Sequence, residues 1–118
     1  MTEPAFSPCP STPNCVSSLE TRTSHSIEPL SYQGASEEAK QRLLDVINGF
    51  PRTRVLEVRD TYIHATFTSF LFRFTDDVEF LIDDTKKLIH MKSASRVGFS
   101  DIGANRRRCE AVRDRFNR

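Results

Sequence analysis

The chain has 118 residues, which is enough for one domain with a single hydrophobic core. Hydrophobic residues make up 37% and charged residues 28%, a balance that excludes an intrinsically disordered chain. Seventeen Lys and Arg against sixteen Asp and Glu give a net charge of +1, so the overall field excludes a general attraction to nucleic acid or to an anionic membrane. Such a partner would need a local patch of charge.

The N-terminal sequence MTEPAFSPCP lacks the basic start and the apolar core of a secretory signal, and no stretch approaches the roughly 20 apolar residues of a membrane span. We therefore expect a cytoplasmic protein, or a periplasmic, lumenal or lipoprotein-like one if an export signal has been removed. Cys9 and Cys15 are close enough in sequence to form a disulfide in an oxidising compartment. Cys109 falls in a helical pattern, where a free cysteine usually belongs to the core.

Residues 1–35 contain five of the six prolines and show little periodicity. We expect an extended N-terminal arm here, with one edge strand where Ile27, Leu30 and Tyr32 alternate with polar residues. The arm is expected to pack on a single α+β domain that occupies residues 36–118.

The first predicted helix begins with Ser36 as its N-cap and ends at Gly49 and Pro51. Glu37 and Glu38 favour its positive end. Its apolar stripe consists of Ala39, Leu43, Ile47 and Phe50.

Between residues 53 and 95 the hydrophobic period changes from about four to two, which predicts antiparallel strands. The turns between them are too short for a crossover helix, so we expect a meander of about four to five strands. Turn chemistry is predicted at 60–61, 76–77 and 83–86, and the strand segments are RVLEV (54–58), YIHATFT (62–68), LFRF (71–74), VEFLID (78–83) and LIHMKSAS (88–95).

A second helix closes the domain, and both helices are expected on one face of the sheet. Its packing face consists of Ile102, Asn105, Cys109, Val112 and Phe116. Five phenylalanines exceed what one small sheet face needs: Phe67, Phe70, Phe72, Phe74 and Phe80. We interpret them as core, with a groove or an interface as the alternative.

Three motifs carry a resemblance to a known family: CPSTPNCVSS (9–18), FRFTDDVEF (72–80) and SASRVGFSDIGANRRR (93–108). Together they are similar to the domain of unknown function 1499 family, whose members are small bacterial and plastid-associated proteins. The resemblance implies a bacterial type of protein, and members often carry an export signal. It implies no established activity.

The run 93–108 joins the last predicted strand to the last helix, and it is the candidate site. Ser100 or Asp101 is predicted as the N-cap of the helix, and the helix start is also a possible anion site. Arg96 is expected to pair with Asp76, Asp77 or Asp101. The complete set of candidates, for a ligand site or a structural network, is Ser95, Arg96, Gly98, Ser100, Asp101, Gly103, Asn105, Arg106, Asp76 and Asp77.

Two interpretations of this run stay open: a capped helix with an arginine paired to a carboxylate, or a site for an anion or polar ligand. Asn105 is expected to bond to backbone in the loop 96–100, with ligand contact as the alternative. Asp76 and Asp77 are interpreted as a turn rather than as a catalytic pair of carboxylates.

The sequence favours a non-enzymatic domain that binds a small ligand, a lipid or a protein partner near residues 93–106. The alternative is an enzyme that uses Arg96, Ser100 and Asp101 with Asp76 or Asp77. No cofactor and no metal site are expected, because the three histidines lack ligand-like spacing. No nucleic-acid partner is expected either, since a helix scatters the arginines at 106–108 and no aromatic lies between them. The sequence does not predict the oligomeric state.

Overall fold

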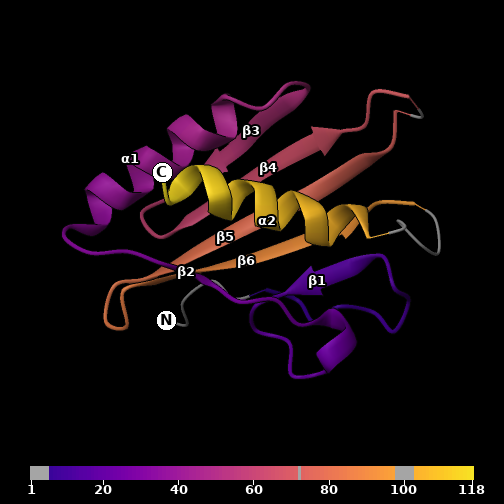
Figure 1. Cartoon of the computed structure of the whole chain (residues 1–118), viewed down its shortest axis with the longest axis horizontal. Coiled ribbons are helices and arrows are strands. Elements are labelled where there is room, and N and C mark those ends of the chain that lie inside the picture. Colours follow the sequence, from indigo (N-terminus) through magenta and orange to yellow (C-terminus); the bar gives the residue numbers. More distant parts are fainter. Residues whose placement is uncertain (1–5, 72, 98–102) are drawn as a thin grey trace.

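A computed structural model describes residues 6–71, 73–97 and 103–118. The chain forms an α+β fold, as predicted, with an antiparallel sheet and two helices (Figure 1). The strand order is β1-β6-β5-β4-β3, and β2 also pairs with β6. The elements are β1 (Cys15–Ser17), the 3-10 helix η1 (Thr23–His25), β2 (Leu30–Ser31), α1 (Ser36–Asn48), β3 (Thr53–Val58), β4 (Tyr62–Thr68), β5 (Thr75–Asp83), β6 (Leu88–Ser95) and α2 (Ala104–Phe116).

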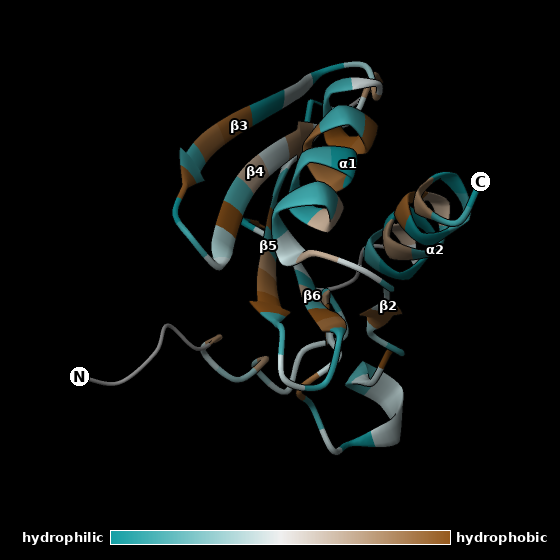
Figure 2. Cartoon of the chain, turned by 90° about the vertical axis from the view of Figure 1, so that its left-hand side faces the viewer, coloured by the Kyte–Doolittle hydropathy of each residue, from teal (hydrophilic) through white to brown (hydrophobic). Residues whose placement is uncertain are grey.

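Both helices cover the same face of the sheet (Figure 2). We call the other face, on which neither helix lies, the open face. Strand β5 shows why: its residues alternate between buried and half-buried, so one side of the strand faces the helices. The core lies between the two layers. Its largest fully buried side chains include Leu43 and Ile47 of α1, Phe80 of β5 and Val112 and Phe116 of α2.

The predicted stripes of both helices are buried at Ala39, Leu43 and Ile47 in α1 and at Asn105, Cys109, Val112 and Phe116 in α2. The predicted N-caps are wrong, whereas α1 ends at Gly49 as predicted. Ala35, not Ser36, is the N-cap of α1, and Gly103 is the N-cap of α2 with a φ of 78°. Gly103 takes this left-handed conformation because glycine has no Cβ to clash. Ser100, Asp101 and Ile102 lie outside the described residues.

The meander differs from the prediction at one turn. Asp76 and Asp77 lie inside β5, and the β4–β5 connection lies at 69–74, where a strand was predicted. Ser69 closes this connection: its N–H donates to the Phe74 carbonyl at 2.9 Å, and its hydroxyl accepts from the Phe74 N–H at 3.0 Å. Asp76 and Asp77 are tolerated within β5 because each of the two is paired with an arginine.

The described part of the predicted arm, residues 6–35, forms two short strands on β6 rather than one edge strand. Val16, Ile27, Leu30 and Tyr32 from this segment are buried in the common core. The structure therefore does not show an extended arm in this segment. The domain boundary at residue 35 stays a prediction. In the described part of the chain, no helix is long and apolar enough to cross a bilayer.

Cys9 and Cys15 form a disulfide with their Cα atoms 5.7 Å apart, and both residues are buried. The loop they close is held from outside as well. Glu20 accepts a hydrogen bond from the Cys9 N–H at 3.2 Å, and His25 lies 2.9 Å from the Cys15 carbonyl through its Nδ1. The disulfide thus fixes the chain that enters β1.

We predict that the double substitution Cys9→Ser and Cys15→Ser lowers the free energy of unfolding by about 2 kcal/mol, because the unfolded chain regains the freedom of a short loop. Urea denaturation checks this. Reductant should lower the stability of the oxidised protein by a similar amount and leave the double variant unchanged. Equal urea midpoints for the oxidised protein and for the double variant would contradict the prediction.

Candidate functional site

The two aspartates at the start of β5 point to opposite faces of the sheet, because side chains alternate along a strand. Asp76 is 4% exposed and faces α2, whereas Asp77 lies on the open face. The candidate residues therefore divide into two groups. We call the group on the helix side the buried polar network, and it consists of Asn14, Asp76, Ser93, Ser95, Asn105 and Arg108.

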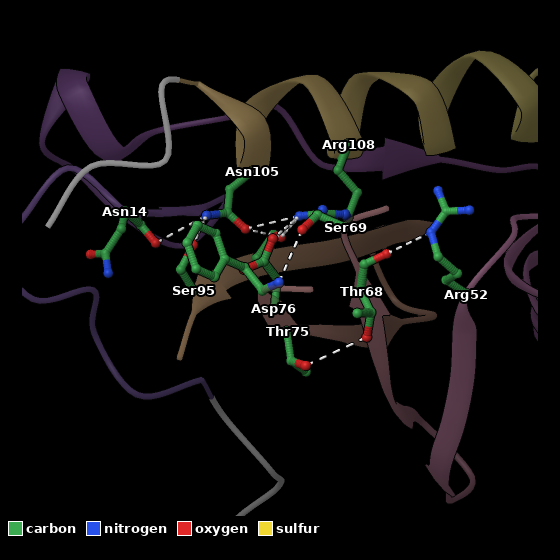
Figure 3. A network of polar contacts seen from close by, with 11 residues as sticks. Asn14, Arg52, Thr68, Ser69, Thr75, Asp76, Ser95, Asn105 and Arg108 are labelled. Carbon is green, nitrogen blue, oxygen red and sulfur yellow. Dashed lines mark hydrogen bonds and ion pairs between the residues drawn. The ribbon is translucent and has the colours of Figure 1, made fainter. Parts of the chain in front are cut away.

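Asn105 is the centre of the buried polar network (Figure 3). It is fully buried, and its side-chain oxygen accepts from the Ser93 hydroxyl at 2.6 Å and from Arg108 Nη1 at 3.2 Å. Its side-chain nitrogen donates to the Asn14 carbonyl at 3.1 Å and to Ser95 Oγ at 3.0 Å. These partners come from β6, from α2 and from the residue before β1. Most of the loop 96–100, to which the amide was predicted to bond, lies outside the described residues, so that contact stays a prediction.

Arg108 and Asp76 form a buried ion pair with 2.6 Å between Nη1 and Oδ2, and their side chains are 14% and 6% exposed. The guanidinium also lies 5.2 Å from the centre of the Phe67 ring. The second oxygen of Asp76, Oδ1, has no hydrogen-bond partner among the described residues. This pair joins the second turn of α2 to the start of β5.

The candidates predicted from the sequence do not include Arg108, Asn14 or Ser93. Arg108 was considered only as one of the arginines that a helix scatters, although its position three residues after Asn105 places it over the same part of the helix. That spacing next to a buried amide was the available signal. Asn14 gave no signal, because its contact is made by a backbone carbonyl.

On the open face, Arg96 forms the predicted pair with Asp77, with Nε 2.9 Å from Oδ2 and Nη2 3.0 Å from Oδ1. His64 of β4 adds a third contact, 2.8 Å from its Nε2 to Asp77 Oδ1. The guanidinium, and to a smaller extent the imidazole, hold the pKa of Asp77 below its usual range. Asp77 is thus stabilised as a carboxylate.

The open face is hollowed beside this pair, at the strand ends near the β4–β5 connection. The hollow has a volume of about 700 Å³. We call it the arginine hollow, and its described lining residues are Arg52, Arg54, Arg73, Arg96, Thr53, Thr66, Thr68, Thr75 and Leu56.

Two of the four guanidinium groups in the arginine hollow are paired: Arg96 with Asp77, and Arg52 with the Thr68 carbonyl, to which its Nε donates at 3.0 Å. Arg54 and Arg73 have no ion pair or side-chain hydrogen bond to any residue that the structure describes. No carboxylate is among the described lining residues, and Asp77 contacts the hollow through Arg96. The hollow therefore carries an excess of positive charge.

Among the remaining described candidates, Arg106 belongs to neither group. Arg106 donates to the Ser26 carbonyl at 2.8 Å and the Ser24 carbonyl at 3.2 Å, which ties α2 to the segment before β2. Gly98, Ser100 and Asp101 lie outside the described residues. In the described part of the chain no group of three or more histidines, cysteines or carboxylates is arranged to hold a metal ion.

The phenylalanines also divide. Phe67 and Phe80 are in the core, as predicted, but Phe70 is 69% exposed and Phe74 is 52% exposed, so their interpretation as core is wrong. Leu71 between them is 74% exposed. We call Phe70, Leu71 and Phe74 the hairpin tip. Phe72 lies outside the described residues.

The sequence model of a family described as a protein of unknown function (DUF1499) matches residues 5–116. No curated protein matches the chain at a significant level.

We predict that Asn105→Ala lowers the free energy of unfolding by about 1 to 3 kcal/mol, because it leaves buried hydrogen-bonding groups of Ser93, Ser95 and Asn14 without this partner. Chemical denaturation gives the value. Asp114→Ala is a suitable control, since it removes an exposed pair with Arg118 on the same helix and should cost less than about 0.5 kcal/mol. An unchanged midpoint for Asn105→Ala would show that the amide is not structural.

We also predict that Asp77→Asn lowers stability near neutral pH by no more than about 1 kcal/mol, because the pair with Arg96 is partly exposed to solvent. A carboxyl whose pKa is lowered in the folded state stabilises the fold above its ordinary value of 3.8 and loses this effect as the pH falls through the folded-state value. The difference between the two proteins should therefore shrink by about pH 3. Urea titrations at both pH values measure it, and a difference that grows in acid would refute the assignment.

Proposed function

The chain belongs to the DUF1499 family, and we propose that it is a non-enzymatic binding domain whose arginine hollow takes an anionic group such as a phosphate or a carboxylate. The observation that carries the proposal is the pair of guanidinium groups, on Arg54 and Arg73, that have no partner among the described residues. They lie beside Arg96, which belongs to the run that the sequence marked as the candidate site. Guanidinium groups bind phosphates and carboxylates through two parallel hydrogen bonds.

The threonines support the same ligand chemistry. Thr66, Thr68 and Thr75 line the hollow, and the hydroxyls of Thr68 and Thr75 lie 3.4 Å apart. A hydroxyl can donate to an anion without adding charge, so these side chains complement the arginines. The hollow is also open to solvent, which suits a binding surface more than an enclosed reaction site.

The enzyme alternative has less support. Asp76 faces α2 and is paired with Arg108, so its carboxylate lies on the face of the sheet opposite to the Arg96–Asp77 pair. Asp77 is near Arg96, but its lowered pKa is the opposite of what a general base for reaction near neutral pH requires. Ser100 and Asp101 lie outside the described residues.

The proposal predicts that the protein binds inorganic pyrophosphate and that the double substitution Arg54→Gln and Arg73→Gln weakens this binding by at least about tenfold, since each charge-assisted hydrogen bond is worth 1.5 to 3 kcal/mol in favourable cases. Calorimetric titration at constant ionic strength measures the dissociation constants. Both side chains are exposed, so the variant should keep its fold.

The matched control is Lys40→Gln with Lys86→Gln, which removes the same charge from α1 and from the β5–β6 turn, outside the hollow. Binding should survive in this control. An equal loss in both double variants would show a nonspecific charge effect, and no binding by the unaltered protein would refute the proposed function.

A further inference from the structure

We propose that the anionic group is the phosphate of an acidic lipid at a membrane surface, and that the hairpin tip inserts into that surface beside it. This inference rests on the proposed function and adds a second set of contacts. It uses the hairpin tip, which plays no part in the binding of a soluble anion.

The apolar groups gather at one end of the molecule. The β4–β5 connection and the end of β6 lie at the same side of the sheet (Figure 1). The Arg96 N–H donates to the Thr75 carbonyl at 3.2 Å, so Arg96, directly after β6, lies beside the start of β5. Val97, which is 60% exposed, thus joins the apolar end formed by the hairpin tip.

The hairpin tip is held outward by its own backbone. The two hydrogen bonds between Ser69 and Phe74 close the connection, and Arg73 takes a left-handed φ of 56°. The Arg52 guanidinium lies 5.4 Å from the centre of the Phe70 ring, which supports that ring from the side of the sheet. Large apolar side chains fixed in solvent are typical of a surface that contacts a partner.

Charge complementarity identifies that partner. The arginine hollow begins where the hairpin tip ends, since Arg73 belongs to the β4–β5 connection and Arg52 touches Phe70. A membrane surface with acidic lipids offers an apolar layer directly beneath a layer of phosphates. An arginine can reach the phosphates while neighbouring apolar side chains enter the acyl region. A protein partner would have to supply both features from separate side chains.

The acidic groups of the open face lie away from the hairpin tip, which favours an orientation with the tip toward the membrane. Glu79 accepts from the Tyr62 hydroxyl at 2.6 Å, and Tyr62 begins β4, at the end of that strand opposite to the hairpin tip. Glu57 is paired with Arg59. Glu57 lies near the end of β3 that is farther from the hollow, and Arg59 directly follows that strand. The positive end of the open face is therefore the end that carries the exposed phenylalanines.

The experiment is co-sedimentation of the whole chain with phosphatidylcholine vesicles that contain or lack phosphatidylglycerol. We expect binding only to the vesicles with phosphatidylglycerol. Phe70→Ser with Leu71→Ser should weaken this binding by at least about tenfold and leave pyrophosphate binding unchanged. Arg54→Gln and Arg73→Gln should weaken it by about fivefold for each arginine.

The matched control for the hairpin tip is Leu19→Ser with Val58→Ser, which removes two exposed apolar side chains elsewhere and should leave vesicle binding unchanged. Pyrophosphate binding without vesicle binding would overturn the inference and leave the proposed function intact. Failure to bind either probe would overturn both.

Vesicle binding that survives Phe70→Ser with Leu71→Ser would overturn insertion of the hairpin tip. Sedimentation velocity of the proteins without vesicles tests whether a second copy of the chain covers the hairpin tip instead. A dimer that the same substitutions convert to a monomer would show that a second copy covers the tip, and this would also overturn the inference.

Discussion

The structure depends on one buried ion pair, between Arg108 at the start of α2 and Asp76 at the start of β5. Removing one partner of such a pair costs about 3 to 5 kcal/mol, because the other charge stays buried. Asn105 adds donors and acceptors that are satisfied together when α2 starts opposite Ser93 and Ser95 of β6. A shift of the helix by one residue would break these bonds at once, so the network fixes the register of α2 on the sheet.

Because side chains alternate along a strand, the position of Asp76 on the helix-covered face also determines which residue lies on the open face. Because Asp76 must face α2, Asp77 must face away from it, and there it accepts two hydrogen bonds from Arg96. Arg96 is thereby held at the edge of the arginine hollow, and its N–H donates to the Thr75 carbonyl at the start of β5. A structural contact on the covered face thus positions a guanidinium group on the open face. The two neighbouring carboxylates have different roles for a geometric reason rather than a chemical one.

Sequence could predict what depends on local pattern. The stripes of α1 and α2, the meander and the Arg96–Asp77 pair follow from periodicity and charge. Asp76 and Asp77 were misassigned to a turn, because aspartate favours turns until an ion pair from a distant helix outweighs that preference. The arginine hollow was not foreseeable. Its guanidinium groups come from positions 52, 54, 73 and 96, which only the pairing of β3, β4, β5 and β6 brings together.

A net charge of +1 is compatible with an anion-binding surface because the charges are separated in space. Composition averages over the chain, whereas an approaching anion responds to charges within roughly a Debye length of about 8 to 10 Å. At the hollow this local sum includes four guanidinium groups and the carboxylate of Asp77. Other carboxylates, such as Glu37 and Glu38 in the first turn of α1, are exposed elsewhere on the surface, where they balance the total charge without cancelling the local field. Near-neutral composition therefore excludes long-range steering, but it does not exclude binding at contact distance.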